Sequence, residues 1–365
     1  MKILHFSYLF FENGNGITTA VVNQCNYENK VSDVKSKIFA TNKVVCNEGN
    51  ELYRDYIGRD LGVNSNRSSL FAAFSFLQKM KPDIVYFHNI FDIKSVFLSL
   101  VCAFFKIKYF VVPHSSLMRT AQLKNKLIKK IYINTAGRFL IYKASAICYL
   151  NKSEMDNSIQ ICQNVRRVII PNGVKKQKPV ERTKKSEGLN VLYFGRYDIN
   201  HKGIDILINY ISYFREYMVA NNITLTMFGS GDIGKVKALV SELSLDMIVS
   251  INGPVFSVDK DQMFISHDVL VLTSRYEGLP IAVLESLSYG LPCILSENTN
   301  MNECIDIGAA LRCDNKEDFI NAIKALQTRE RYLLASKKAY HFIDHNYSWE
   351  KIVKDRIEIC KQILN

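Results

Sequence analysis

Short apolar segments alternate with longer segments of helical periodicity along most of this chain, and this alternation constrains the fold more than any other feature. In the first half we expect strands at residues 2–8, 37–40, 84–88, 109–113, 146–150 and 167–170. Between them we expect helices at 18–26, 69–80, 93–105 and 123–144. Strands that alternate with helices in this way predict a parallel sheet with helices on both of its faces.

Residues 175–190 interrupt the alternation with a polar, charged segment that contains Pro and Gly, which is typical of an interdomain linker. The alternation then restarts, with strands expected at 191–195, 224–229, 249–252, 269–272 and 293–296, and helices at 204–219, 233–243 and 349–364. We therefore expect an α/β protein of two Rossmann-like, doubly wound domains facing a cleft, covering residues 1–178 and 179–346. Ligands bind such sheets at the carboxyl ends of the strands.

The charge differs between the two halves. Residues 1–180 hold 26 Lys and Arg against 11 Asp and Glu, whereas residues 181–365 hold 21 against 24. A basic first half favours an anionic partner, such as a phosphate-bearing substrate, an anionic lipid surface or nucleic acid. The nine cysteines form no CxxC pair, the first residues lack the regions of a signal peptide, and no apolar run is long enough to span a bilayer. We expect a cytoplasmic location.

Residues 274–285, SRYEGLPIAVLE, place two acids on either side of a turn and a helix start. Pro280 suits the first turn of a helix that would run to about residue 289. Glu277 would then lie just before the helix and Glu285 inside it. Free N–H groups at a helix N-terminus bind phosphate, and flanking carboxylates accept hydrogen bonds from sugar hydroxyls. The segment predicts a nucleotide-sugar site.

Other polar or glycine-rich groups follow the predicted strands of the second half. Arg196 and Lys202 come after the first of these strands and could reach a diphosphate together, although either cation alone would more often be a solvated surface charge. Gly229 lies in a G-S-G-D turn that permits close ligand approach or is simply a tight turn. Backbone groups at 252–255 could pair with the edge of a nucleobase or form a structural turn.

Together these features resemble the retaining GT-B glycosyltransferases of family 4, also described as glycosyl transferases group 1. The motifs that carry the resemblance are G-R-x5-K-G at 195–203, F-G-S-G at 228–231, N-G-P-V at 252–255 and E-x7-E at 277–285. In the first half they are joined by Gly14, Gly16, His88, Pro113-His114 and P-N-G-V at 171–174. The resemblance covers nearly the whole chain, and it implies that the C-terminal helix, within 347–365, returns to the first domain.

The resemblance also implies roles at the matched positions. Glu285 would hold the ribose hydroxyls and Glu277 would contact the transferred sugar, while Arg196 and Lys202 would neutralise the departing diphosphate. His114 would hydrogen-bond the donor sugar, or it is a capped loop histidine without that role. The first domain would bind the acceptor and the second the donor. The remaining donor-binding positions would be Gly14, Gly16, Gly229, Gly253, Pro254, Gly278 and Leu279.

The implied function is metal-independent, retaining transfer of a hexose from a UDP- or GDP-sugar to a glycan acceptor, with no cofactor. The acceptor would be a lipid-linked intermediate of bacterial surface polysaccharide: O-antigen, capsule or exopolysaccharide. Residues 119–143 hold seven basic residues and no acid, so they predict peripheral contact with an anionic membrane at its inner face, or an ordinary solvated basic helix. The alternatives are a nucleotide-sugar epimerase of the same fold and a basic nucleic-acid-binding protein, for which no helix-turn-helix or aromatic platform is evident.

Overall fold

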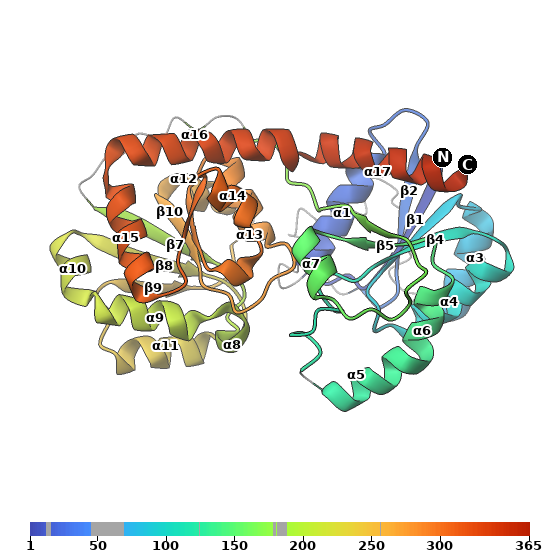
Figure 1. The fold of residues 1–365 in the computed structure, drawn as a ribbon, viewed down its shortest axis with the longest axis horizontal. Helices are drawn as coiled ribbons and strands as arrows, with labels where there is room; N and C mark the ends of the chain where they lie inside the picture. Colours follow the sequence, from blue (N-terminus) through green and yellow to red (C-terminus); the bar gives the residue numbers. More distant parts are fainter. Residues whose placement is uncertain (12–15, 45–68, 124, 178–179, 181–187, 256) are drawn as a thin grey trace. The chain divides into compact units, whose positions relative to one another are not determined.

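A computed structural model describes residues 1–11, 16–44, 69–123, 125–177, 180, 188–255 and 257–365 of the chain (Figure 1). The chain divides into two compact units. Unit 1 comprises Met1–Gly173 and Trp349–Asn365, and unit 2 comprises Val174–Ser348. Each unit contains one six-stranded sheet in which every pair of neighbouring strands is parallel, so the prediction of two Rossmann-like domains is confirmed.

The sheet of unit 1 has the strand order β2-β1-β3-β4-β5-β6. Its strands are β1 (Lys2–Ser7), β2 (Lys35–Ala40), β3 (Ile84–His88), β4 (Lys108–Val112), β5 (Ala146–Tyr149) and β6 (Arg167–Ile169). Its helices are α1 (Gly16–Glu28), α3 (Leu70–Met80), α4 (Ile93–Phe104), α5 (Lys126–Tyr132), α6 (Arg138–Tyr142), α7 (Lys152–Asn157) and α17 (Trp349–Leu364). Because β1 lies between β2 and β3, the strand order reverses between β1 and β3, and these neighbours form the switch point of this sheet.

Period-two alternation gives the two faces of this sheet different partners. Leu4, Phe6 and Val85 belong to one apolar core with residues of α3, α4 and α6. The opposite face is covered by α1 and α17, which pack against each other. In β1, His5 is fully buried on that second face, where its register partner in β3 is Tyr86.

The C-terminal helix returns to the first domain, as the sequence predicted. One stripe of α17, formed by Trp349, Ile352, Val353 and Ile357, is buried against Met1, Tyr27 and Val34. The helical spacing of these apolar positions leaves polar residues on the outer side. The contact is tight, because a Cβ on Gly173 would lie 2.6 Å from the Trp349 ring.

One continuous helix was expected over residues 123–144, but the structure differs. Helix α5 begins only at Lys126, and a π-helical segment, Ile133–Gly137, separates it from α6. This segment holds a β-branched pair, Ile133 and Thr135, and ends on a glycine, all of which have lower helix propensity than Ala or Leu. A π-helical insertion needs one more residue per turn, so it shifts the faces of α5 and α6 relative to each other.

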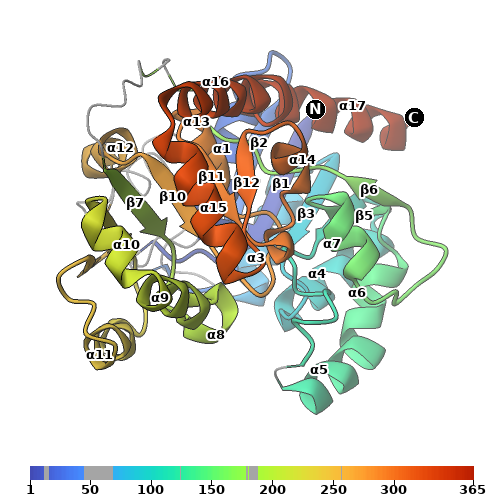
Figure 2. The same ribbon diagram turned by 60° about the vertical axis from the view of Figure 1, so that its left-hand side comes forward.

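The sheet of unit 2 has the strand order β12-β11-β10-β7-β8-β9. Its strands are β7 (Leu189–Phe194), β8 (Ile223–Phe228), β9 (Val249–Asn252), β10 (Val269–Leu272), β11 (Cys293–Leu295) and β12 (Ala310–Arg312). Its α-helices are α8 (Ile199–Lys202), α9 (Ile204–Tyr213), α10 (Arg215–Ala220), α11 (Ile233–Glu242), α12 (Ser257–Ser266), α13 (Ile281–Ser288), α14 (Asn302–Asp306), α15 (Lys316–Gln327) and α16 (Arg329–Asn346). Helix α16 packs against α13 and α15 (Figure 2).

The order of strands reverses between β7 and β10, so these central neighbours form the switch point of the sheet. The segment that follows β7 contacts the segment that follows β10 at Gly203. This residue is the N-cap of α9 and has a φ of +60°. A Cβ on Gly203 would lie 2.0 Å from the carbonyl oxygen of Thr273, just after β10. The Thr273 hydroxyl in turn donates to the Gly203 carbonyl at 2.8 Å.

Replacing Gly203 with Ala is expected to reduce the free energy of unfolding by at least about 1–2 kcal/mol, because Ala is strained at this φ and its Cβ would overlap the Thr273 carbonyl. Gly234, in the first turn of α11, is the matched control, because a Cβ there would meet no atom within 4 Å. Gly234→Ala should leave stability unchanged or raise it slightly. Chemical unfolding followed by circular dichroism measures both, and equal stability of G203A and G234A would contradict the close approach.

Candidate active site

A buried ion pair lies at the switch point of unit 2. The Lys202 Nζ at the end of α8 is 2.6 Å from Oε1 of Glu277, which follows β10. The Ser274 hydroxyl donates to the same oxygen at 2.7 Å. Within the described residues, Oε2 of Glu277 has no hydrogen-bond partner, so one carboxylate oxygen is fixed and the other can accept a bond from a ligand hydroxyl.

The backbone of Glu277 is fixed from the segment after β11. Its N–H donates to the Asn298 carbonyl at 3.0 Å, and the Asn300 side-chain amide donates to the Glu277 carbonyl. Asn300 adopts a left-handed φ of 58°, a conformation that Asn tolerates better than most residues. No motif indicated either asparagine, because nothing local in the sequence relates them to residue 277.

Arg196 is exposed after β7 and is oriented by His201 of α8. The Nε2 of His201 lies 2.9 Å from the Tyr276 carbonyl, which can only accept, so Nε2 carries the proton. The unprotonated Nδ1 then accepts from the Arg196 guanidinium at 3.4 Å. Burial is the main cause that lowers the pKa of His201, which favours this neutral form although Glu277 opposes the shift. His201 also stacks on the Tyr276 ring, with centroids 4.1 Å apart.

Glu285 lies within α13 and has a partner that the sequence did not indicate. Its Oε1 is 2.6 Å from the Nζ of Lys260 on α12. As at Glu277, one oxygen is held by a lysine, whereas Oε2 has no partner in the described part of the chain. Pro280 is not inside the helix as expected. It is the N-cap residue, and its carbonyl accepts the first helical bond, from Val283 at 3.0 Å.

The glycines expected at the donor site differ in whether the structure leaves room for a side chain. A Cβ on Gly229 would lie 1.9 Å from the Gly195 carbonyl, so the ends of β7 and β8 can approach only with glycine there. A Cβ on Gly253 would meet no atom within 4 Å, and Gly253 and Pro254 are both exposed. Gly278 and Leu279 are buried between the two acids.

In unit 1, His114 follows β4 and is partly buried, with a left-handed φ of 47°. Its Nε2 lies 3.0 Å from Nδ1 of His88, the last residue of β3. Burial is the main cause that lowers the pKa of His114 to about 3, so the ring is neutral. Gly16 is exposed at the start of α1, and Gly14 lies outside the described residues. No group of three or more His, Cys, Asp or Glu among the described residues is placed to hold a metal ion.

The model of the family described as glycosyl transferases group 1 matches residues 188–329, which include every donor-site residue described in unit 2. Over 99% of both chains, the protein is 24% identical to an uncharacterized 41.2 kDa protein in the cps region of Klebsiella pneumoniae. It is 23% identical to the GDP-mannose:cellobiosyl-diphosphopolyprenol alpha-mannosyltransferase of Xanthomonas campestris, over 81% of this chain and 79% of the relative.

Among solved structures, HepE of Anabaena, in complex with UDP and glucose, superposes with a TM-score of 0.74. The match covers 99% of this chain and 100% of HepE at 14% identity, which shows a shared fold. The chain therefore has a GT-B fold whose second unit carries a glycosyl transferases group 1 domain, and together these findings support a glycosyltransferase.

Proposed function

We propose that this protein is a retaining, metal-independent family 4 glycosyltransferase. It transfers a hexose from a UDP- or GDP-sugar to a lipid-linked glycan in the synthesis of a bacterial surface polysaccharide. The observation that carries the proposal is the pairing of Lys202 with Glu277 at the switch point of the second sheet. A cation beside a carboxylate that has one oxygen without a partner among the described residues suits a ligand that carries both phosphate and hydroxyl groups.

The chemistry follows from where charge develops. Breaking the bond between sugar and diphosphate adds negative charge to the leaving group, and preorganised cations stabilise it. Lys202 and Arg196 are held by Glu277 and His201, so they supply this charge without reorganising. In this role they replace a metal ion, and the departing phosphate oxygen takes the proton of the acceptor hydroxyl on the same face of the sugar, which retains the configuration.

The two carboxylates bind hydroxyl groups in this proposal. Glu277 accepts from the transferred sugar through its open Oε2, and Glu285 accepts from the ribose. The ion pair with Lys260 holds one carboxylate oxygen of Glu285 in place, so that the other can face the ribose. Gly278 and Leu279 place the backbone at the start of α13 beside both groups, where the helix dipole favours the negative diphosphate.

The relatives support the choice of acceptor. The Xanthomonas protein is named for mannosyl transfer to a diphosphopolyprenol-linked glycan, and the Klebsiella protein is encoded in a cps region. Both matches cover most of this chain and therefore extend into unit 1, which would bind the acceptor. A lipid-linked acceptor lies at a membrane surface, so the enzyme would work at the inner face of the cytoplasmic membrane.

Arg196→Ala combined with Lys202→Ala is expected to lower kcat on the order of 100-fold or more, because two preorganised charges at the leaving group are lost. Lys235→Ala is the matched control, since Lys235 is an exposed cation of the same unit that pairs with Asp232. Transfer is measured with radiolabelled UDP- and GDP-sugars and polyprenyl-diphosphate-linked acceptors, with and without EDTA. Near-normal turnover of the double variant would contradict the role of this pair.

The same assay separates the alternatives. Loss of wild-type transfer in EDTA that added Mg²⁺ restores would contradict metal independence. Conversion of the nucleotide sugar without any acceptor would instead identify an epimerase. Nuclear magnetic resonance of the new glycosidic bond distinguishes retention from inversion.

Unit 1 presents an apolar and basic surface that fits the proposed membrane contact. On α4, four exposed residues share one helical stripe: Ile93, Phe97, Leu100 and Phe104. Helices α5 and α6, the second of which packs against α4, expose Leu127, Ile128, Ile131, Phe139 and Tyr142. Exposed or partly exposed cations lie among these residues: Lys106, Lys126, Lys129, Lys130, Arg138 and Lys143. We call these residues of α4, α5 and α6 the basic apolar surface.

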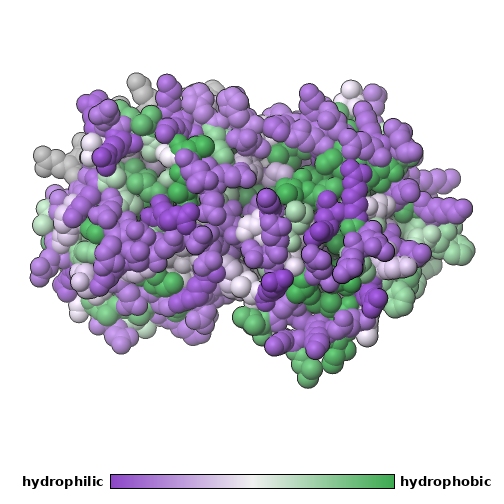
Figure 3. Space-filling view, in the orientation of Figure 1, coloured by the Kyte–Doolittle hydropathy of each residue, from purple (hydrophilic) through white to green (hydrophobic). Residues whose placement is uncertain are grey.

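Figure 3 shows apolar atoms in green beside hydrophilic ones at the lower end of unit 1, where Figure 1 places α5. Apolar side chains that insert among lipid headgroups and cations that attract anionic lipids are the two components of interfacial binding. No helix in the described residues is long and apolar enough to cross a membrane. We propose that the basic apolar surface binds an anionic bilayer.

Leu127→Asp combined with Ile131→Asp is expected to reduce cosedimentation with phosphatidylglycerol vesicles at least about tenfold, since buried apolar area is lost and negative charge is added. Leu334→Asp is the control, because Leu334 is comparably exposed but lies on α16 of unit 2. Neutral phosphatidylcholine vesicles should bind the wild type more weakly. If the double variant binds anionic vesicles like the wild type, the surface is an ordinary solvated helix face.

A further inference from the structure

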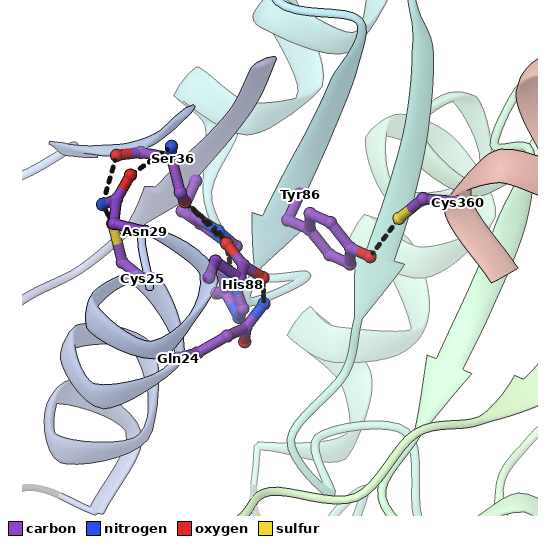
Figure 4. Close-up of polar contacts among 9 residues, drawn as sticks. Gln24, Cys25, Asn29, Ser36, Tyr86, His88 and Cys360 are labelled. Atoms are coloured by element: carbon purple, nitrogen blue, oxygen red, sulfur yellow. Dashed lines mark hydrogen bonds and ion pairs between the residues drawn. The ribbon is translucent and has the colours of Figure 1, made fainter. Parts of the chain in front are cut away.

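A polar layer is buried beneath α1 and α17 in unit 1, on the face of the sheet that carries His5. Glu28 and Gln24 reach it from α1, Ser36 from β2 and His88 from β3, and every one of these side chains is at least 95% buried. Figure 4 shows Gln24, Ser36 and His88 gathered in one group beside α1, with Tyr86 directed toward Cys360. Burial of polar groups is unfavourable unless they are paired, and these are paired with one another.

Four of these groups form a linear array. Oε2 of Glu28 lies 2.8 Å from Nε2 of His5, whose Nδ1 lies 2.9 Å from Nε2 of His88. Nδ1 of His88 lies 3.0 Å from Nε2 of His114. The array therefore leads from a buried carboxylate, through two buried imidazoles, to the partly buried histidine after β4.

The carboxylate fixes the direction of these hydrogen bonds. Glu28 receives the Ser36 hydroxyl at 2.6 Å, the Gln24 amide at 2.8 Å and His5 Nε2–H, so it is the ionised acceptor of three donors. When His5 is neutral, its only ring proton is on Nε2, and its Nδ1 must accept from His88 Nε2–H. His88 Nδ1 must then accept from His114 Nε2–H. Nδ1 of His114 is left as an acceptor, and the described residues give it no partner.

We propose that Glu28, His5 and His88 are positioning residues that hold His114 in the Nε2–H tautomer. Its Nε2–H is donated to His88, and its Nδ1 accepts a hydrogen bond from a hydroxyl of the donor sugar. The other tautomer would present an N–H at that position and could not accept this bond.

Burial and the charges around the array keep the rings of His88 and His114 neutral and Glu28 ionised. Arg356, a buried cation on α17, lies over the Tyr86 ring with its guanidinium carbon 5.4 Å from the centroid. Burial chiefly, and then His5, His114 and Arg356, hold the pKa of His88 well below its usual value. Burial would raise the pKa of Glu28, but His5, Arg356 and Ser36 together hold it below its usual value. The other titratable neighbours, Tyr86, Cys148 and Cys360, have raised pKa values, chiefly because of burial, and are neutral.

The loop that carries His114 is held separately from the array. The buried Glu154 of α7 accepts the Ser115 N–H at 2.5 Å and the Leu150 N–H at 2.6 Å. His114 and Ser115 both have left-handed φ values, 47° and 66°, which are uncommon for residues other than glycine and are typical of functional sites when held in place. The catalytic use of the array rests on the proposed function, in which His114 contacts the donor sugar. The tautomer of His114 does not depend on the proposed function.

The tautomer can be measured directly in the full chain labelled with ¹⁵N-histidine. Two-bond ¹H–¹⁵N spectra, with His114 assigned by the loss of its signals in His114→Gln, should show a neutral ring protonated on Nε2 at neutral pH. Protonation of His114 on Nδ1 in the wild type would overturn the proposal, whether or not any variant folds. Glu28→Gln should give His114 a mixture of both tautomers, and Glu358→Gln, an exposed exchange on α17, should not. An unchanged His114 tautomer in folded Glu28→Gln would also overturn it.

Kinetics test the catalytic use of this tautomer. Glu28→Gln should lower kcat of sugar transfer on the order of 10-fold or more, with the donor KM within about twofold, because the fraction of His114 in the other tautomer cannot accept from the donor sugar. Glu28→Asp, which keeps the carboxylate, should recover part of this loss. Equal turnover of Glu28→Gln and Glu358→Gln would refute the positioning role. If the wild type shows the Nε2–H tautomer but transfers no sugar, the proposed function fails and the fixed tautomer stands.

Discussion

The parallel direction of all strands within each sheet is the constraint on which the rest of the structure depends. It brings the carboxyl end of every strand in a unit to one edge, so residues far apart in the sequence become neighbours. Lys202 and Glu277 are 75 positions apart, and they meet because β7 and β10 are adjacent at the point where the strand order reverses. The same geometry in unit 1 places His88 beside His114, because β3 and β4 are neighbours.

Much of the architecture could be predicted from local pattern. The bounds of β3, β9, β10 and α17 match the expected ranges, because each is a strongly apolar or amphipathic segment with clear breakers at its ends. The short β12 was missed, since three residues, Ala310–Arg312, carry too little periodicity. The long α16 was missed because its charged sequence has only a weak apolar stripe, and its packing on α13 and α15 stabilises it.

The candidate site was predicted as a set of residues, not as a set of contacts. The resemblance indicated Glu277, Glu285, Arg196 and Lys202, and the structure brings Lys202 and Glu277 together. It also shows that Glu285 is paired with Lys260, which no motif indicated. An ion pair between residues 260 and 285 depends on how α12 lies beside α13, and this tertiary arrangement leaves no local signal. His5 likewise gave no sign of its contacts with Glu28 and His88, because it is a single polar residue within a buried strand.

The charged groups of the two units therefore lie in different environments. In unit 2, Lys202 and Arg196 lie at the sheet edge, where each is oriented by a partner. In unit 1 the carboxylate of Glu28 and the guanidinium of Arg356 lie buried inside the domain, on α1 and α17. Buried charges of this kind require the complete layer of helices above them to exclude water and hold their partners.

The order of the segments along the chain also affects synthesis. Helix α17 leaves the ribosome after all of unit 2, yet it belongs to unit 1, where it packs on the face of the sheet that carries His5. Until it arrives, the side of the first domain that holds Met1, Tyr27 and Val34 is open to solvent, and Arg356 is absent from the layer. The second domain can complete its own core earlier, because its strands and helices are contiguous in the chain. Synthesis therefore completes the second domain before the first, and a nascent chain that lacks α17 lacks Arg356 in the buried polar layer.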